Sequence, residues 1–173
     1  QRNLKKGRIR FSRNLEAAVL RSEVVFLCLP TPPGEDGSAD LKYILQVADD
    51  MGKIFARNPG AGYKVIVDKS TVPVGTSDKV DAAIRRHLDA RFEFDVVSNP
   101  EFLREGYAVE DFLRPERVVI GSSSERAVAI LQDLYEPFIP AGHPVIVMDE
   151  KSGEVTKYAA NAFLAMKISY MND

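Results

Sequence analysis

The chain has 173 residues, of which 45% are hydrophobic and 28% charged, and its formal net charge at pH 7 is -2. This is the length and composition of one ordinary globular domain. The slightly negative net charge does not favour binding to nucleic acid or to an anionic membrane, so we expect neither as a partner. The single Cys28 excludes an internal disulfide framework and predicts a reducing, cytoplasmic compartment, while the longest apolar run, 24–29, is too short to span a bilayer.

Apolar runs alternate with amphipathic stretches along the chain. Five runs are predicted to be strands because they are short and rich in β-branched and aromatic residues: 24–29, 63–68, 92–98, 117–122 and 144–148. Four stretches show the periodicity of a helix with one buried face: 41–57, 77–90, 124–138 and a last one from about Ser152 to the end. Strands separated by such helices predict a single α/β unit, with a parallel sheet and helices on both of its faces.

Polar turns follow the first three predicted strands. The first turn contains Thr31, the second contains Ser70 and Thr71 within KSTVPVGT, and the third reads NPEFLREG. The carboxyl ends of parallel strands share one edge, where ligands bind in sheets of this kind. Three proline-containing polar turns at that edge therefore predict the floor of a ligand site.

Two pairs of polar residues have the i, i+4 spacing of one helix face. If the third turn is helical, Glu101 and Glu105 face the same way and repel weakly; a solvated first helical turn is the ordinary explanation. In the last predicted helix, Lys157 and Asn161 have the same spacing among apolar neighbours, which predicts a buried helix. An ammonium and a carboxamide facing a site there could stabilise an oxyanion, and the alternative is a solvent-facing Lys beside an incidental Asn.

The glycine pattern of a complete dinucleotide-binding domain does not occur in this sequence. Such a domain carries G-x-G-x-x-G after its first strand and an acidic residue roughly 20 residues later. The chain also begins with Gln and ends in what we expect to be the middle of a helix. We therefore expect a fragment whose first βαβ unit lies before residue 1.

Nearly the whole chain resembles the UDP-glucose 6-dehydrogenase family of nucleotide-sugar dehydrogenases. The resemblance is carried by five motifs in order: LPTPPGEDGSADL, VDKSTVPVGT, SNPEFLREGYAVEDF, RPERVVIG and GEVTKYAANAFLAMKISYMND. It implies a Rossmann-like NAD-binding domain, with residues 1–150 as its later part and 151–173 as the start of a long central helix. The C-terminal nucleotide-sugar domain would then be absent, and the parent protein would be a homodimer or a larger homo-oligomer.

The resemblance also implies the reaction and the residues that catalyse it. Members of the family oxidise the C6 alcohol of a nucleotide sugar, here UDP-glucose, to a carboxylate in two steps with NAD. Position in the motifs implies that Glu101 is the general acid/base and that Thr71 holds the catalytic water. It implies that Lys157 and Asn161 stabilise oxyanion character at C6, and it implies no metal.

Binding residues follow from the same motif positions. The resemblance implies NAD contacts at Thr31, Ser70, Thr71 and Glu105. It implies that the sugar nucleotide is lined by Glu101, Phe102, Leu103, Arg104, Glu105, Lys157 and Asn161. The two glutamates of the third turn would then be a functional pair and not a solvated helix start.

One departure and several alternatives accompany this interpretation. The family uses a cysteine nucleophile from its C-terminal domain, which forms a thioester; Cys28 lies in an apolar strand and is predicted to be structural. We therefore expect the isolated chain to be inactive. The alternatives are a GDP-mannose or UDP-aminosugar 6-dehydrogenase, a β-hydroxyacid dehydrogenase, whose Gly–Lys–Asn helix would match Gly153, Lys157 and Asn161, and a non-catalytic nucleotide-binding module.

Overall fold

A computed structural model describes residues 2–35, 38–89 and 92–172. Within these residues one sheet of 5 strands has the order β1-β2-β3-β4-β5. The strands are β1 (Val24–Leu27), β2 (Lys64–Asp68), β3 (Phe94–Ser98), β4 (Val118–Gly121) and β5 (Val145–Met148). Each lies inside one of the runs predicted from the sequence, so the predicted strands are confirmed.

The sheet is mixed, whereas the sequence predicted only parallel pairs. β1–β2, β2–β3 and β4–β5 are parallel, but β3 and β4 pair antiparallel through Ser98 and Gly121. The connection between them contains only the short helix α5 (Ala108–Leu113), which has no buried residue. A parallel neighbour needs a crossover packed over the sheet, and α5 provides none, so β4 runs back alongside β3.

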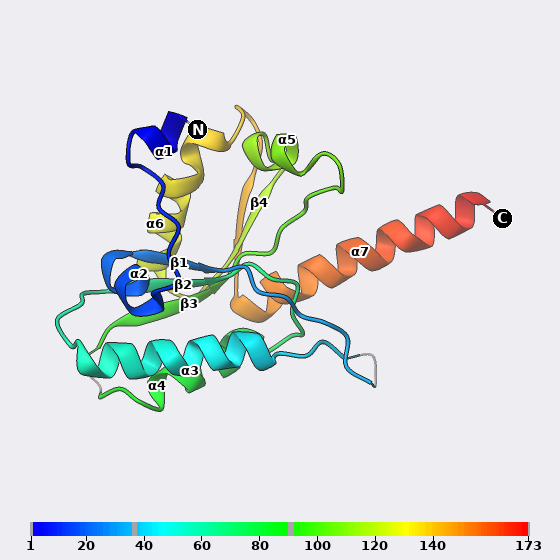
Figure 1. The fold of residues 1–173 in the computed structure, drawn as a ribbon. Helices are drawn as coiled ribbons and strands as arrows, with labels where there is room; N and C mark the ends of the chain where they lie inside the picture. The colour runs from blue at the N-terminus through cyan, green and yellow to red at the C-terminus, as the bar shows by residue number, and fades with distance from the viewer. Residues whose placement is uncertain (1, 36–37, 90–91, 173) are drawn as a thin grey trace.

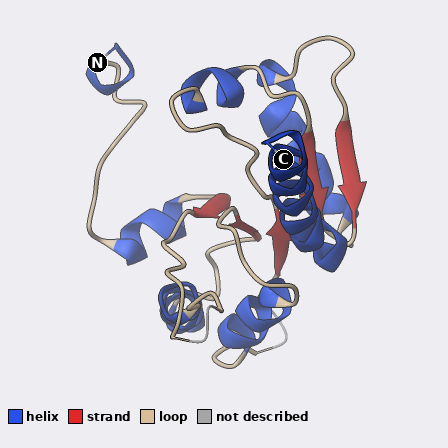
Figure 2. Ribbon diagram, turned by 90° about the vertical axis from the view of Figure 1, so that its right-hand side faces the viewer, coloured by secondary structure: helices blue, strands red, loops and turns tan. Residues whose placement is uncertain are grey.

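Helices cover both faces of the sheet, as predicted (Figures 1 and 2). Alternate residues of β2 point to opposite faces: Ile66 joins the core beneath the helices of one face, whereas Val65 and Val67 join the core beneath the helix of the other. The first face is covered by α2 (Leu15–Arg21), α3 (Lys42–Arg57) and α4 (Thr76–Arg85), and the second by α6 (Glu125–Tyr135).

Helix boundaries differ modestly from those predicted. The 77–90 prediction became α4, which ends at Arg85, and position 90 lies outside the described residues. The 124–138 prediction became α6 followed by a short 3-10 helix, η1 (Glu136–Phe138), because Pro137 cannot continue an α-helix. Three short helices were not predicted from the sequence: α1 (Arg2–Lys5), α2 and α5.

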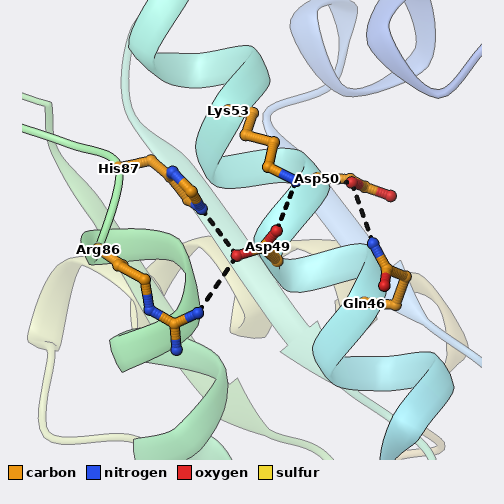
Figure 3. Close-up of polar contacts among 6 residues, drawn as sticks. All are labelled: Gln46, Asp49, Asp50, Lys53, Arg86 and His87. Atoms are coloured by element: carbon orange, nitrogen blue, oxygen red, sulfur yellow. Dashed lines mark hydrogen bonds and ion pairs between the residues drawn. The ribbon is translucent and has the colours of Figure 1, made fainter.

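Helices α3 and α4 pack closely at Gly52. A Cβ atom there would lie 2.6 Å from the carbonyl oxygen of Ile84, so only glycine allows this approach. Beside it, three side chains contact the Asp49 carboxylate, with Lys53 Nζ at 2.7 Å, His87 Nε2 at 2.7 Å and Arg86 at 3.4 Å. Figure 3 shows these three side chains pointing toward the Asp49 carboxylate, which ties α4 to α3.

The last helix, α7 (Glu150–Asn172), packs on the sheet only through its first turns. A Cβ at Gly153 would lie 3.1 Å from both Gly121 Cα and Ser98 Oγ, so this turn lies directly on β3 and β4. Beyond Asn161 the helix leaves the body of the molecule (Figure 1), and Phe163, Leu164 and Met166 are exposed. The expectation of a buried helix is therefore wrong for the second half. No helix in the described residues is long and apolar enough to cross a membrane.

Candidate active site

A pocket of about 370 Å³ lies between the turn after β3, the start of β4 and the first half of α7. It brings together six of the residues predicted to act in the site: Glu101, Phe102, Leu103, Arg104, Lys157 and Asn161. The remaining four, Thr31, Ser70, Thr71 and Glu105, do not line it. Six of the ten predicted positions thus gather in one place. Thr71, predicted to hold the catalytic water, and Glu105, predicted to contact the substrate, lie outside the pocket together with Thr31 and Ser70.

Glu101 and Lys157 form an ion pair inside this pocket. The ammonium lies 3.1 Å from Oε1 of Glu101, and the Lys157 side chain is 9% exposed whereas that of Glu101 is 31% exposed. The other carboxylate oxygen, Oε2, accepts the backbone amide of Leu103 at 2.5 Å. The pair joins two segments that are 56 residues apart in the chain and leaves the carboxylate accessible from the pocket.

The turn that carries Glu101 is not helical. Residues 101–104 have no regular structure and helix α5 begins only at Ala108. The Glu101 carboxylate accepts the Leu103 amide in place of a helical bond. The hypothesis that Glu101 and Glu105 share a helix face is therefore wrong, and Glu105 is exposed and does not line the pocket.

A buried asparagine, which the sequence analysis did not single out, anchors this turn. Asn99 is 1% exposed, and its amide nitrogen donates to the Val119 carbonyl at 2.7 Å. Its Oδ1 accepts the Tyr135 hydroxyl at 2.6 Å and the Lys69 ammonium at 3.2 Å. Burial raises the pKa of Tyr135 to about 12, so the phenol stays protonated and donating. Asn99 thus joins β2, β4 and α6 at the point where the turn starts.

Lys69 is a second ammonium in the pocket. Burial lowers its pKa, while the nearby Cys28 and Glu101 favour its charged form and Lys157 opposes it. Within the described chain its hydrogen bonds go to neutral acceptors, the backbone and side-chain oxygens of Asn99. Only its place directly before Ser70, at a strand end, could have identified it from the sequence.

Arg104 and Asp111 form the rim of the pocket. The guanidinium makes two contacts with the carboxylate, at 2.7 and 3.1 Å, and the Arg104 amide donates to the same carboxylate at 2.8 Å. These hydrogen bonds lower the pKa of Asp111. Arg104 was predicted as a substrate residue, and here its charge is matched by Asp111.

Hydroxyl groups tie the turns after β1 and β2 together at the neighbouring edge of the sheet. Ser70 Oγ accepts the Leu29 amide at 2.9 Å and donates to the Leu29 carbonyl, while Thr31 Oγ1 donates to the Thr71 carbonyl at 3.0 Å. The Thr71 hydroxyl has no hydrogen bond to any described residue and is half-buried. Hydroxyls and backbone amides of this kind suit the hydroxyl and phosphate groups of NAD, so Thr31, Ser70 and Thr71 fit one side of an NAD site.

Two buried carboxylates lie behind these turns. Glu154 of α7 is 2% exposed and binds the amino end of α4, accepting from Gly75 N at 2.5 Å, Ser77 N at 2.7 Å and Ser77 Oγ at 2.8 Å. Asp68 is 1% exposed, and neither of its oxygens has a hydrogen-bond partner in the described chain. Burial and the negative charge of Glu154 raise the pKa of Asp68 to about 7, although the nearby Ser70 amide, without forming a hydrogen bond of good geometry, opposes the rise.

Cys28 differs from its prediction. It lies just past the end of β1 and is exposed, so it is not a core residue of the strand. Partial burial nevertheless raises the pKa of its thiol, which keeps it protonated and a poor nucleophile. No group of three His, Cys, Asp or Glu side chains in the described residues is arranged to hold a metal ion.

The fold and the pocket define the class of this protein. A largely parallel sheet with helices on both faces and polar turns at the carboxyl ends of its strands is the Rossmann-like arrangement for binding a nucleotide at that edge. The sequence profile of the UDP-glucose/GDP-mannose dehydrogenase family, NAD-binding domain, matches residues 1–139. The chain belongs to this family, and the predicted cofactor, NAD, is confirmed by that match.

Individual relatives agree with this assignment. The chain is 44% identical to UDP-glucose 6-dehydrogenase TuaD of Bacillus subtilis (strain 168) over 173 residues, which are 100% of this chain and 36% of that protein. A solved UDP-glucose dehydrogenase from the hyperthermophilic archaeon Pyrobaculum islandicum matches with a TM-score of 0.88 and 42% identity, over 98% of this chain and 38% of the other. A GDP-mannose dehydrogenase from Pseudomonas aeruginosa matches with a TM-score of 0.86 and 29% identity, over 99% and 39%.

These matches cover little more than a third of each relative's length. The resemblance and the fold class drawn from the sequence are confirmed. The roles given to individual site residues and the division at residue 150 stay predictions.

Proposed function

We propose that this chain is the NAD-binding portion of a longer UDP-glucose 6-dehydrogenase that oxidises UDP-glucose to UDP-glucuronate. The observation that supports it best is the Glu101–Lys157 pair, which places a carboxylate and an ammonium 3.1 Å apart in a pocket at the sheet edge. The alignment to a UDP-glucose 6-dehydrogenase, at 44% identity, extends over all 173 residues and therefore spans the segments that form the pocket.

We choose UDP-glucose as the substrate because the chain is more similar in sequence to UDP-glucose dehydrogenases than to a GDP-mannose dehydrogenase. Identity is 42% to a solved UDP-glucose dehydrogenase and 29% to a solved GDP-mannose dehydrogenase, although both have nearly the same backbone. GDP-mannose is therefore the second candidate substrate. A 3-hydroxyisobutyrate dehydrogenase of Mycobacterium tuberculosis is 18% identical with a TM-score of 0.55, a likeness of fold alone, so we do not retain the β-hydroxyacid alternative.

The chemistry follows from the groups in the pocket. The Glu101 carboxylate lies beside the Lys157 ammonium and is open to the pocket, so it can accept a proton from the C6 hydroxyl or from water. The Lys157 ammonium can turn from Glu101 to the oxygen that gains charge at C6. Asn161, one helical turn further along α7, lines the same pocket and adds an amide donor. Two oxidations and one water convert the alcohol to the carboxylate.

NAD, when bound, accepts one hydride in each oxidation. We propose that Thr31, Ser70 and Thr71 hold it at the edge beside the pocket, with Glu105 at the nicotinamide end and the Thr71 hydroxyl near the catalytic water. The thioester-forming cysteine would come from a part of the longer protein outside this sequence, because the exposed Cys28 thiol is kept protonated. The 173-residue chain alone would then be inactive, and the complete protein would be a homodimer or a larger assembly.

The test measures NADH formed by the complete protein with UDP-glucose, GDP-mannose and UDP-N-acetylmannosamine. We expect two NADH per UDP-glucose and much slower reaction with the other two. Glu101→Gln removes the base, and loss of one general base lowers a rate by about 100-fold or more. We also expect this variant to accumulate a covalent acyl-enzyme, detected by mass spectrometry of the denatured protein.

Glu110→Gln is the matched control, because Glu110 is exposed on α5 and does not line the pocket. It should react at the wild-type rate. One NADH per turnover, or a Glu101→Gln variant as active as Glu110→Gln, would refute the four-electron reaction or the role of Glu101.

A further inference from the structure

Arg117, directly before β4, is held against an aromatic ring of the pocket. Its guanidinium carbon lies 4.2 Å from the centroid of the Phe102 ring, and its side chain is 36% exposed. Lys157 approaches the same ring, with its ammonium 5.5 Å from the centroid. Phe102 thus spaces Arg117 from the catalytic ammonium, and the two cations are separated by no more than the sum of these distances.

The pocket is basic although the chain is slightly acidic. Five cationic side chains line it, Lys69, Arg104, Arg114, Arg117 and Lys157, against three carboxylates, Glu101, Asp111 and Glu116, whereas the chain has a formal net charge of -2. A concentration of one charge in a cleft attracts ligands of opposite charge.

The pairing of these charges locates the excess. Glu101 forms an ion pair with Lys157, and Asp111 forms one with Arg104. Glu116 is almost fully exposed and reaches Arg117 only at 3.9 Å, and Arg114 makes no ion pair with any described residue. The unmatched positive charge of the pocket therefore lies at Lys69, whose hydrogen bonds go to neutral acceptors, and at Arg114 and Arg117.

Stacking prepares Arg117 to bind an anion. A guanidinium is held over a ring face by electrostatic attraction, which uses none of its five N–H donors as a hydrogen bond would. Its position is already fixed, so less side-chain entropy is lost when a ligand binds. Arginine matches the paired oxygens of phosphate groups with two parallel hydrogen bonds.

We propose that Arg117, fixed by Phe102 and assisted by Arg114, is the residue of this pocket that binds the diphosphate of a nucleotide. The inference rests on the proposed function and extends it. A hexose whose C1 phosphate lies at Arg117 would reach across the Phe102 ring, with its C6 end toward Glu101 and Lys157. Arg117 is then a binding residue that sets which end of the substrate reaches the catalytic pair.

Two ligands of the reaction carry a diphosphate, the sugar nucleotide and NAD. The structure favours the sugar nucleotide, because Arg117 shares its aromatic contact with Lys157, while the hydroxyls suited to NAD lie outside the pocket. Measuring the KM for UDP-glucose and the KM for NAD separately shows which of the two diphosphates Arg117 binds.

The experiment compares Arg117→Met with wild type in the complete protein. We expect the KM for UDP-glucose to rise about 10- to 100-fold, the value of one lost charge-assisted contact pair, with kcat changed less than about threefold and the KM for NAD unchanged. Inhibition by UDP should weaken in parallel, whereas inhibition by uridine, which has no phosphate, should stay the same. Arg117→Lys should recover part of the affinity for UDP, since it restores the positive charge but not the two parallel N–H donors of the guanidinium.

Arg85→Met is the matched control. Arg85 also stacks on an aromatic ring, with its guanidinium 4.4 Å from the Phe94 centroid, but it lies on α4, away from the pocket. It should leave both KM values unchanged. Thermal unfolding of all three variants verifies that they fold.

The outcomes separate this inference from the proposed function. An unchanged KM for UDP-glucose in Arg117→Met, or a rise confined to NAD, overturns the assignment of Arg117. If wild type fails to oxidise UDP-glucose, the proposed function is wrong, and calorimetric binding of UDP to wild type and Arg117→Met still decides the inference. Equal affinity of the two proteins for UDP, or no binding to wild type, refutes it.

Discussion

At the scale of single residues, two aspartates show how the environment decides the behaviour of a carboxyl group. Asp49 lies among Lys53, Arg86 and His87 (Figure 3), and hydrogen bonds from Lys53 and His87 lower its pKa to about 2. Asp68 is buried without a partner in the described chain and beside Glu154, and its pKa is raised to about 7. An ionised carboxylate therefore stabilises the folded state at Asp49 and destabilises it at Asp68.

Replacing Asp68 with Asn should stabilise the protein above neutral pH. The carboxyl pKa is about 7 in the fold against an ordinary 3.8, so the folded state holds a proton between these values that the unfolded chain has released. The contribution of Asp68 to the unfolding free energy is complete below pH 4 and is lost as the pH rises to 7. An Asn cannot ionise, and the gain at pH 8 is bounded at roughly 4 kcal/mol.

Urea denaturation at pH 5 and pH 8 measures this difference. Asp49→Asn is the matched control with the opposite sign, because the Asp49 pKa is lowered and its stabilisation is present above pH 3.8 and lost as the pH falls toward 2. That variant should be less stable than wild type at both pH values. If Asp68→Asn were destabilising at pH 8, Asp68 would have a partner that the structure does not show.

At the scale of elements, close packing at glycine positions sets how helices meet their neighbours. Gly153 allows α7 to lie on Ser98 and Gly121, and Gly52 allows α3 to lie on α4. Glu154 adds a directional contact, since it binds the amino end of α4 from α7. The helix that carries Lys157 is thus positioned by its neighbours on both sides.

The variant Gly52→Ala should destabilise the α3–α4 contact. Its methyl group would lie 2.6 Å from the Ile84 carbonyl oxygen and 2.9 Å from the His87 ring, and backbone cannot move aside cheaply. Overpacking of this kind costs about 1–3 kcal/mol, which outweighs the gain in helix propensity from Ala. Chemical denaturation gives the value. Gly60→Ala, where no atom lies within 4 Å of the new methyl group, should be nearly neutral, and equal effects of both variants would contradict the packing argument.

At the scale of the whole molecule, the structure divides into a packed body and an isolated helix end. The sheet with its covering helices forms the body, while the second half of α7 extends from it (Figure 1). Exposed apolar side chains mark that half: Phe163, Leu164, Met166, Ile168, Tyr170 and Met171. A helix end without tertiary contacts is marginal in water, because most helix stability in proteins comes from packing.

Hydrogen exchange of the 173-residue chain should therefore show two classes of amide. Amides of β2, whose residues are all buried, should exchange only through global unfolding. Amides of residues 163–172 should exchange many-fold faster, by fraying from the end. Protection of residues 163–172 that grows with protein concentration would contradict this expectation and show that a second copy covers the exposed face.

The local sequence was sufficient for the parts of this protein that depend on neighbouring residues. The five strands, the four longer helices and the polar turns at the strand ends follow from side-chain periodicity and proline, and the ordered motifs identified the family. The gathering of Glu101, Lys157 and Asn161 around one pocket was also expected, although that expectation came from the family resemblance of their motifs and not from periodicity.

Only the tertiary structure decided the features that depend on contacts between distant segments. These are the antiparallel β3–β4 pair, the Asn99 hydrogen bonds, the Glu101–Lys157 ion pair and the stacking of Arg117 on Phe102. The exposure of Cys28 and of the end of α7 belongs to the same group. Periodicity records which face of an element is apolar, but not which partner covers that face or whether any partner is present.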